Sequence, residues 1–383
     1  SSSGSAPFRV GSYSLLIPSF GQEEMMDGVI EKSEEATAEW LTEVLRASGC
    51  LPRGHVKDVL LHEEVSYTST IIRMTLTLSE PSPAEAPRQL LLKLSRPDAK
   101  QQVVRSEHRR REVAFHKTVV ANMPNLPIAR CHHAAYCEET GATSLLFDDL
   151  WETHASGKPL SPPEMPQAES AMDAFAAFHA AWWDHSSLSE ISCLPGGRSN
   201  AEKVANIRSQ FPRFADAAGS ILTDHQRRIY EAALVSLPAL YLRVSKGKDL
   251  TLIHGDANFS NVLLPKNADE SEAVIIDWQL YGISFAAEDL AHLIPLFWSR
   301  EQRKDSEVSL LRRYHRGLLF HGVEAYDWDD CWQDYRRAVI LRALFMPMWF
   351  WKAGASEEWW RGCLTRAADA VDDLHCRELM EAH

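Results

Sequence analysis

Two short segments carry the polar residues whose types and spacing could do chemistry. In the first, Asp256 and Asn261 stand five residues apart, directly after the apolar pair 252–253. In the second, the apolar run 274–276 ends in Asp277. Carboxylate and amide oxygens on loops between strands can hold Mg²⁺ against phosphate oxygens, and a further carboxylate can orient a hydroxyl nucleophile. The combination indicates phosphoryl transfer, although a single aspartate after a strand is more often a turn residue.

The full pattern resembles a known family. His-Gly-Asp-x-x-x-x-Asn at 254–261, followed by Ile-Asp-Trp at 276–278, is similar to the catalytic and metal-binding loops of the aminoglycoside phosphotransferase and choline kinase-like family, which are relatives of protein kinases. In this resemblance Asp256 is the catalytic aspartate. Asn261 and Asp277 are the Mg²⁺ ligands.

Two further motifs of the same family concern support of the catalytic loop. Glu-Asp-Leu-Ala at 288–291 resembles a family helix in which Asp289 braces the loop. His254 is expected to be a hydrogen-bonded scaffold residue with no role in proton transfer. His179, in a segment that resembles another family helix, is expected to be a core histidine with its polar atoms satisfied.

A kinase-like fold also requires a lysine for the α- and β-phosphates of the nucleotide and a helix glutamate that orients it. Lys93 fits, because it is the lone charge in the apolar run 90–94. Arg-Glu-Val-Ala-Phe-His at 111–116 resembles the family's Arg-Glu-x-x-Phe-Tyr helix, which favours Glu112 as the partner. Glu107, on the same expected helix, is the alternative.

The turn expected between the first two strands departs from the protein-kinase pattern. Residues 64–71 contain no glycine. Ser66, Thr68 and Ser69 could still offer hydroxyl and N–H groups to a nucleotide phosphate, as Ser/Thr-rich loops do in some relatives of the family. An ordinary polar hairpin is the alternative interpretation.

Residues 145–150, Leu-Leu-Phe-Asp-Asp-Leu, resemble the family's Leu-Leu-Glu-Asp-Leu connector. The resemblance implies that the main chain of Asp148, Asp149 and Leu150 hydrogen-bonds the nucleobase. In the simpler interpretation the two carboxylates only cap a helix or face solvent.

Hydrophobic periodicity predicts the elements that must position these residues. The expected helices span 36–48 and 106–120, and the expected strands span 59–61, 70–78, 90–94, 129–136 and 143–147. Beyond residue 149 the chain is helical and rich in tryptophan, with only Trp40 of the twelve lying earlier. The prolines between 159 and 166 are expected in an exposed connector.

The sequence and the resemblance together predict an α+β, two-lobed, protein-kinase-like fold. An antiparallel sheet is expected in the N-terminal lobe, and the C-terminal lobe is expected to be mainly helical. The predicted divisions are an N-terminal extension over 1–35, a nucleotide-binding lobe over 36–148, and a catalytic and substrate lobe over 149–383.

Charge and cysteine usage limit the classes of partner and compartment. The 383 residues include 40 Lys and Arg against 53 Asp and Glu, a net charge of −13, which disfavours nucleic acid and anionic membranes as partners. No uncharged apolar run approaches the ~18 residues of a membrane span. The seven scattered cysteines form no Cys-x-x-Cys pair, which favours a reducing cytoplasm. The oligomeric state is left open.

The resemblance implies Mg²⁺-dependent transfer of the γ-phosphoryl group of ATP, or of GTP, to a hydroxyl group of a small-molecule acceptor. The acidic C-terminal part favours a cationic acceptor, whereas the aromatic run 344–351 favours a larger apolar alcohol or simply core packing. The overall pattern is closer to the ecdysteroid-kinase-like branch and its bacterial relatives than to the compact aminoglycoside enzymes.

Two other functional classes compete with this interpretation. The first is a kinase-fold nucleotide-binding or regulatory protein that has lost catalysis, for which the glycine-free turn is the only support. The intact set of Asp256, Asn261, Asp277 and Lys93 counts against it. A protein kinase is disfavoured because the loop contains His-Gly-Asp rather than His-Arg-Asp, and because no Ala-Pro-Glu follows Asp277.

Overall fold

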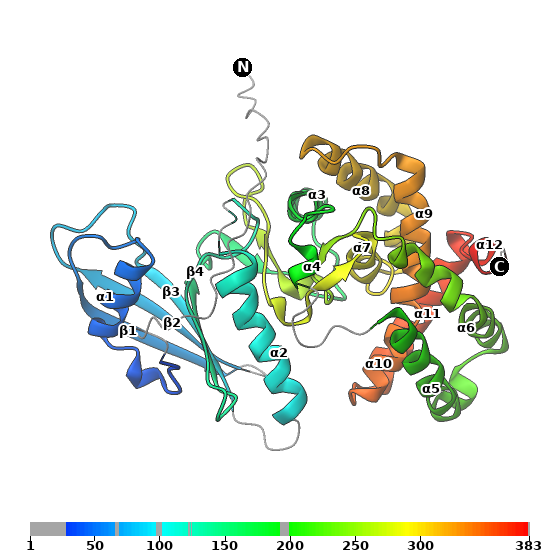
Figure 1. Cartoon of the computed structure of the whole chain (residues 1–383), viewed down its shortest axis with the longest axis horizontal. Coiled ribbons are helices and arrows are strands. Elements are labelled where there is room, and N and C mark those ends of the chain that lie inside the picture. Colours follow the sequence, from blue (N-terminus) through cyan, green and yellow to red (C-terminus); the bar gives the residue numbers. More distant parts are fainter. Residues whose placement is uncertain are drawn as a thin grey trace. The chain divides into compact units, whose positions relative to one another are not determined.

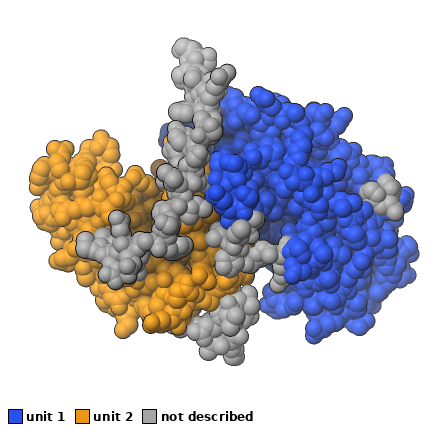
Figure 2. Space-filling model, viewed as in Figure 1, with its two compact units in different colours: residues 1–12, 156–275, 281–383 blue, residues 13–155, 276–280 orange. Residues whose placement is uncertain are grey.

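The computed structural model describes residues 28–65, 69–96, 102–121, 123, 125–191 and 199–381. Two compact units divide the chain (Figure 2). Of the described residues, those up to 155 and those from 276 to 280 make up the N-terminal unit, and the remainder make up the C-terminal unit. None of the described helices combines the length and the apolar character that crossing a bilayer requires.

A five-stranded antiparallel sheet forms the centre of the N-terminal unit (Figure 1). In sheet order its strands are β1 (Val56–Val65), β2 (Ser69–Leu78), β3 (Gln89–Ser95), β5 (Thr143–Asp148) and β4 (Cys131–Tyr136). Along β3, Leu90, Leu92 and Leu94 are buried, whereas Leu91 and Lys93 between them are partly exposed. Because side chains alternate along a strand, Lys93 lies on the opposite face from the three buried leucines.

The leucine face of the sheet is covered by α1 (Ala38–Ala47), which follows the short turn η1 (Ser33–Glu35). Thr37 caps this helix, since its Oγ1 accepts the N–H of Trp40 at 3.2 Å. Leu41, Val44 and Leu45 are buried in one hydrophobic cluster with the leucines of β3. This apolar stripe holds the short helix in place, as the predicted amphipathic pattern requires.

The opposite face of the sheet carries α2 (Gln102–Ala114), which contacts β4 and β5. The sequence predicted one helix over 106–120. The helix instead begins earlier, at Gln102, and after Ala114 it continues as a π-helical turn, η2 (Phe115–Val119). Phe115 in this turn is fully buried. The turn η5 (Trp278–Leu280) also contacts α2 and belongs to the N-terminal unit.

Helices dominate the C-terminal unit, as predicted. They are α3 (Met165–Ala181), α4 (Leu188–Ile191), α5 (Asn200–Ala218), α6 (Asp224–Ser245), α7 (Ala287–Leu293), α8 (Arg300–Phe320), α9 (Trp328–Ala338), α10 (Met346–Lys352), α11 (Glu357–Asp373) and α12 (Arg377–Glu381). Shorter turns are η3 (Gly219–Ile221), η4 (Phe259–Asn261) and η6 (Val339–Ala343). Pro166 lies in the first turn of α3 rather than in the expected connector, because a proline at this position loses no helical hydrogen bond.

Short strands carry the polar loops of the C-terminal unit. β7 (Thr251–Ile253) pairs antiparallel with β10 (Gly282–Ser284), and β8 (Val262–Pro265) pairs antiparallel with β9 (Val274–Ile275). β6 (His154–Ser156) spans the sequence boundary between the units. The apolar pair 252–253 therefore lies in β7, and the first two residues of the apolar run 274–276 form β9.

A close helix contact between α3 and α8 yields a test of this packing. A Cβ added at Gly317 in α8 would lie 2.7 Å from the Cβ of Ala176 in α3. Ala176 is fully buried. We expect Gly317→Ala to lower the free energy of unfolding by about 2 kcal/mol, because overpacking must displace one helix. Chemical denaturation measures this change. Gly282→Ala is the control, since an added Cβ there has no neighbour within 4 Å; an equal loss in both variants would contradict the packing argument.

Candidate active site

The loop that carries Asp256 begins at the end of a buried strand. All three residues of β7 are buried, and the strand ends at Ile253, directly before His254. The hydroxyl of Thr251 donates to the carbonyl of His179 at 2.7 Å, which ties β7 to α3. The starting point of the loop is therefore set by a strand that has little freedom to move.

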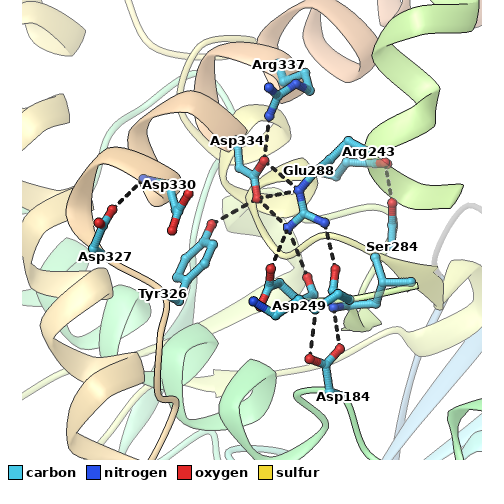
Figure 3. A network of polar contacts seen from close by, with 12 residues as sticks. Asp184, Arg243, Asp249, Ser284, Glu288, Tyr326, Asp327, Asp330, Asp334 and Arg337 are labelled. Carbon is cyan, nitrogen blue, oxygen red and sulfur yellow. Dashed lines mark hydrogen bonds and ion pairs between the residues drawn. The ribbon is translucent and has the colours of Figure 1, made fainter. Parts of the chain in front are cut away.

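A polar network fixes the chain just before β7 (Figure 3). Arg243 of α6 donates to both carboxylate oxygens of Asp334 in α9, at 2.9 Å for Nε to Oδ1 and 2.7 Å for NH2 to Oδ2. The same guanidinium donates to the carbonyl of Asp249 at 3.3 Å. Asp184 accepts the N–H groups of Asp249 and Leu250, each at 2.9 Å. Such bidentate and charge-assisted bonds give the segment a defined geometry.

A buried carboxylate, Asp289 of α7, holds the main chain of the loop itself. Its Oδ2 accepts the N–H of His254 at 2.6 Å, and its Oδ1 accepts the N–H of Gly255 at 2.9 Å. Gly255 has φ +79°, a conformation that glycine adopts without strain. His179 Nε2 lies 3.2 Å from Oδ2, and the hydroxyl of Tyr314 lies 2.9 Å from Nδ1 of the same ring. The predicted brace and the predicted core histidine are both present.

Asp289 is charged in this buried place because its neighbours favour the charge. Burial on its own raises the pKa of a carboxyl, but the adjacent rings of His179 and His254 and the N–H of Gly255 lower the pKa of Asp289 below its ordinary value. The carboxylate is 1% exposed. The brace therefore contributes stability as long as Asp289 is ionised.

Asp256 and Asn261 contact each other within one tight loop. Asn261 Nδ2 donates to the main-chain carbonyl oxygen of Asp256 at 2.9 Å. The same nitrogen lies 3.3 Å from the side-chain Oδ2 of Asp256. The N–H of Asp256 donates to His254 Nδ1 at 3.1 Å, so His254 is the scaffold residue that the sequence predicted. Asn258 Oδ1 accepts the N–H of Ser260 at 2.9 Å, an Asx turn that closes the loop. The Asp256 side chain is 28% exposed, so it can reach a ligand.

His292 is a neighbour of Asp256 that the sequence analysis missed. Its Nε2 lies 3.8 Å from Asp256 Oδ1, and its ring is fully buried. Arg342 of η6 contacts the other ring nitrogen, Nδ1, at 3.2 Å, and also donates to the carbonyl of Gly255. A sequence signal existed: His292 follows Asp289 by three residues, so both lie on one side of a helix.

A second polar cluster lies in the N-terminal unit and joins Lys93, Glu112 and Asp277. Lys93 Nζ lies 2.7 Å and 2.9 Å from the two oxygens of Glu112, and 2.7 Å from Oδ1 of Asp277. Burial on its own lowers the pKa of a lysine, but the two carboxylates raise the pKa of Lys93 above its usual value. The lysine therefore carries a positive charge between two acidic groups. The carboxylate of α2 that pairs with Lys93 is therefore Glu112, and not the alternative Glu107.

Asp277 is held in an unusual backbone conformation. Its φ is +67°, in the left-handed region that few residues other than glycine adopt. The next residue, Trp278, is fully buried and stacks on Phe115 of η2, with ring centroids 4.3 Å apart and planes 7° apart. Gln279 Nε2 donates to Asp277 Oδ2 at 3.2 Å. The stacked tryptophan thus anchors the segment that presents Asp277 to Lys93.

The remaining nucleotide-binding predictions fall on the end of β5 and the start of β2. Asp148 Oδ1 lies 2.7 Å from His132 Nε2, and Asp149 Oδ1 lies 2.5 Å from Arg73 NH1. The N–H of Leu150 has no main-chain acceptor among the described residues.

The hydroxyl residues of the predicted phosphate loop are covered only in part. Ser69 is the first residue of β2 and is buried. Ser66 and Thr68 lie outside the described residues.

Asn261 of the C-terminal unit and Asp277 of the N-terminal unit each carry a side-chain oxygen of the kind that Mg²⁺ takes as a ligand. Because Asn261 donates its Nδ2 hydrogens to Asp256, its amide Oδ1 is the atom that could meet a cation. Within the described ranges, no three or more His, Cys, Asp or Glu side chains are grouped to hold a metal by themselves. A cation would need further ligands, and Mg²⁺ commonly keeps phosphate oxygens and water.

The brace yields a prediction with a defined pH dependence. Because the pKa of Asp289 is lowered on folding, its contribution to stability is present above its unfolded pKa and is lost as the pH falls through the folded value. We expect Asp289→Asn to lower the free energy of unfolding by about 3 kcal/mol at neutral pH, because an amide nitrogen then faces buried donors. Denaturation of both proteins between neutral pH and about pH 3 should show the difference shrinking.

The exposed carboxylate Asp305 supplies the control for this measurement. Asp305→Asn should leave the unfolding free energy nearly unchanged at every pH, since exposed substitutions cost little. A pH-independent loss in Asp289→Asn would show that the residue contributes packing rather than charge.

Comparison with solved structures identifies the fold. A choline kinase from Cryptosporidium parvum matches with a TM-score of 0.53 and 10% identity, over 90% of this chain and 98% of that one. A proposed aminoglycoside phosphotransferase from Ralstonia eutropha matches with a TM-score of 0.51 and 12% identity, over 90% of this chain and 98% of that one. At such identities the likeness shows the fold alone, and it confirms the predicted α+β, two-lobed, kinase-like fold.

Sequence comparison adds the family. A Caenorhabditis elegans protein described as uncharacterized oxidoreductase dhs-27 is 31% identical over 114 residues, which are 27% of this chain and only 14% of that protein. The ecdysteroid kinase-like family model matches residues 64–322, more than half of the chain. Family and fold point to a small-molecule phosphotransferase. The chain belongs to the ecdysteroid kinase-like family.

Proposed function

We propose that this protein is a small-molecule kinase that transfers the γ-phosphoryl group of ATP to a hydroxyl group of its acceptor, with GTP as the alternative donor. The observation that carries the proposal is the loop at 254–261. It holds a partly exposed carboxylate, Asp256, against Asn261, and a buried carboxylate braces its main chain. A rigid, partly exposed carboxylate is what orientation of a hydroxyl nucleophile demands.

In the proposed reaction Asp256 orients the acceptor hydroxyl and accepts its proton. The acceptor oxygen forms a bond to the γ-phosphorus while the bond from that phosphorus to the β–γ bridging oxygen breaks, so ADP leaves. Asn261 and Asp277 would hold Mg²⁺, which neutralises charge on the phosphate oxygens when it is bound.

The polar cluster of Lys93, Glu112 and Asp277 in the N-terminal unit supports the proposal of nucleotide binding. Lys93 is positively charged and is paired to two carboxylates, Glu112 and Asp277. We assign Glu112 to orient the lysine and Lys93 to meet the α- and β-phosphates. Nucleotide phosphates would replace Asp277 as a partner of Lys93, which would release that carboxylate for a cation.

The main chain near the end of β5 is assigned to the nucleobase. The carboxylates of Asp148 and Asp149 already contact His132 and Arg73, so side chains at these positions are poorly placed to read a base. The N–H of Leu150 is the donor that we assign to this contact. The hydroxyls of Ser66, Thr68 and Ser69 are assigned to the phosphates.

Aromatic side chains near the candidate loop bear on the acceptor. The ring of Phe297 stacks on that of His292, with centroids 5.7 Å apart. Its centroid also lies 6.4 Å from that of Phe350 and 5.9 Å from that of Trp359, and both of these rings are partly exposed. Such rings favour an acceptor with an apolar ring face, and they also suit a quaternary ammonium group. We therefore propose a ring-containing apolar alcohol, such as a steroid, as the first acceptor class and choline as the second.

The cell compartment is also a proposal. The described cysteines Cys50, Cys131, Cys137, Cys331, Cys363 and Cys376 are free thiols. Free thiols suit a reducing compartment, and we propose the cytoplasm.

Activity is tested by ATP consumption with Mg²⁺ across steroid alcohols, choline, aminoglycosides, amino alcohols and sugars. We expect Asp256→Ala to lower kcat at least about 100-fold with any acceptor that the wild-type protein uses, because the loss removes the proton acceptor. Asp305→Ala, which removes an exposed carboxylate, should leave kcat unchanged. Near-wild-type turnover by Asp256→Ala would rule out the assignment. A wild-type protein that binds no nucleotide would favour the inactive alternative.

Nucleotide binding is tested separately by calorimetry with Mg·ATP. Lys93→Met should weaken binding about tenfold or more, because the phosphates lose a desolvated cation. Lys57→Met, which removes an exposed lysine of β1, is the control. Since Lys93 also balances two carboxylates, thermal unfolding must show that the variant is folded. Equal affinities in a folded Lys93→Met and the wild-type protein would remove Lys93 from the site.

A further inference from the structure

We infer that His292 is a positioning residue that holds the carboxylate of Asp256 from the side opposite Asn261. Its Nε2 lies 3.8 Å from Asp256 Oδ1, whereas Asn261 Nδ2 lies 3.3 Å from Oδ2. The two oxygens of one carboxylate therefore face two different nitrogen groups. This inference rests on the proposed function, because it assigns a residue to the same reaction.

Arg342 determines which nitrogen of His292 carries the hydrogen. A guanidinium has only donors, so the Arg342 NH2 group that lies 3.2 Å from Nδ1 requires Nδ1 to be the acceptor. In the neutral ring the hydrogen then sits on Nε2, the nitrogen that faces Asp256. Arg342 also donates to the carbonyl of Gly255, so its guanidinium is attached to the loop that carries Asp256.

The environment of His292 keeps the ring neutral and its donor unused. Burial, followed by the charge of Arg342, lowers the pKa of His292 well below its ordinary value. Nε2 is a buried atom with no hydrogen-bond partner among the described residues. Leaving a buried donor unpaired costs free energy, so native structures pair nearly all such groups. An N–H group 3.8 Å from a carboxylate oxygen already attracts that charge before any acceptor binds, and a small movement would complete the hydrogen bond.

The consequence for the reaction is geometric. Hydrogen bonds of catalytic groups are often long without substrate and tighten in the reactive complex. An N–H from His292 to Oδ1 would stop rotation of the Asp256 carboxylate and aim its other oxygen at the acceptor hydroxyl. His292 itself touches neither the nucleotide nor the hydroxyl in this assignment.

Two substitutions separate the two ends of the ring. His292→Gln can place an amide N–H near the position of Nε2, whereas His292→Asn keeps an oxygen near Nδ1 for Arg342 but cannot reach Asp256. We expect His292→Asn to lower kcat about 10- to 100-fold with little change in KM for ATP, because only alignment of the carboxylate is lost. His292→Gln should retain kcat within about threefold.

A matched control uses a buried histidine elsewhere in the unit. His315 is buried and its Nε2 contacts the carbonyl of Tyr326 at 2.9 Å. His315→Asn should lower stability without lowering kcat. Equal kcat values for His292→Asn and the wild-type protein, or equal losses in His292→Asn and His292→Gln, would overturn the inference.

A double-mutant cycle tests the same contact without any acceptor. Denaturation of wild type, Asp256→Asn, His292→Asn and the double variant should show coupling of at least about fivefold in the unfolding equilibrium constant. Additive effects would overturn the inference even in an active enzyme. Coupling in a protein that phosphorylates no acceptor would support the contact between His292 and Asp256 while the proposed function fails.

Discussion

The C-terminal unit depends on one buried negative charge. Asp289 can remain ionised only because two main-chain N–H groups of the candidate loop and the ring of His179 surround it. The loop, in turn, has its conformation at Gly255 because those N–H groups must point at the carboxylate. A buried charge and a strict loop geometry therefore require each other. α3, α7 and β7 converge on this contact, and Asp256 follows it directly along the chain.

The N-terminal unit also contains partly buried charges, and there a lysine balances two carboxylates. Lys93 extends from the middle strand of the sheet on the face away from its buried leucines, where α2 supplies Glu112. Asp277 reaches the same lysine from a segment far along the chain, and the stacking of Trp278 on Phe115 holds that segment in place. One cation between two carboxylates is a stable arrangement that a stronger anionic ligand can rearrange.

Local pattern predicted most of the fold because the elements follow their own periodicities. The alternation in β3 and the spacing of Leu41, Val44 and Leu45 in α1 each reflect burial of one face. Several element boundaries differed, and the strand predicted over 59–61 is part of the longer β1 (Val56–Val65). The helix predicted to begin at 106 starts at Gln102, and Pro166 enters α3 rather than a connector, since propensity is weakest at element ends and proline is tolerated in a first turn.

The sequence by itself determined which polar residues stand close along the chain, such as Asp256 with Asn261, because a tight loop leaves residues five apart little freedom. Its family motifs also indicated Asp289 and the Lys93 partner Glu112. Only the tertiary structure decided that His292 and Arg342 approach Asp256 and Gly255, and that Asp277 pairs with Lys93. Those contacts join segments separated by tens to hundreds of residues. They depend on how helices and strands pack, which a local pattern does not encode.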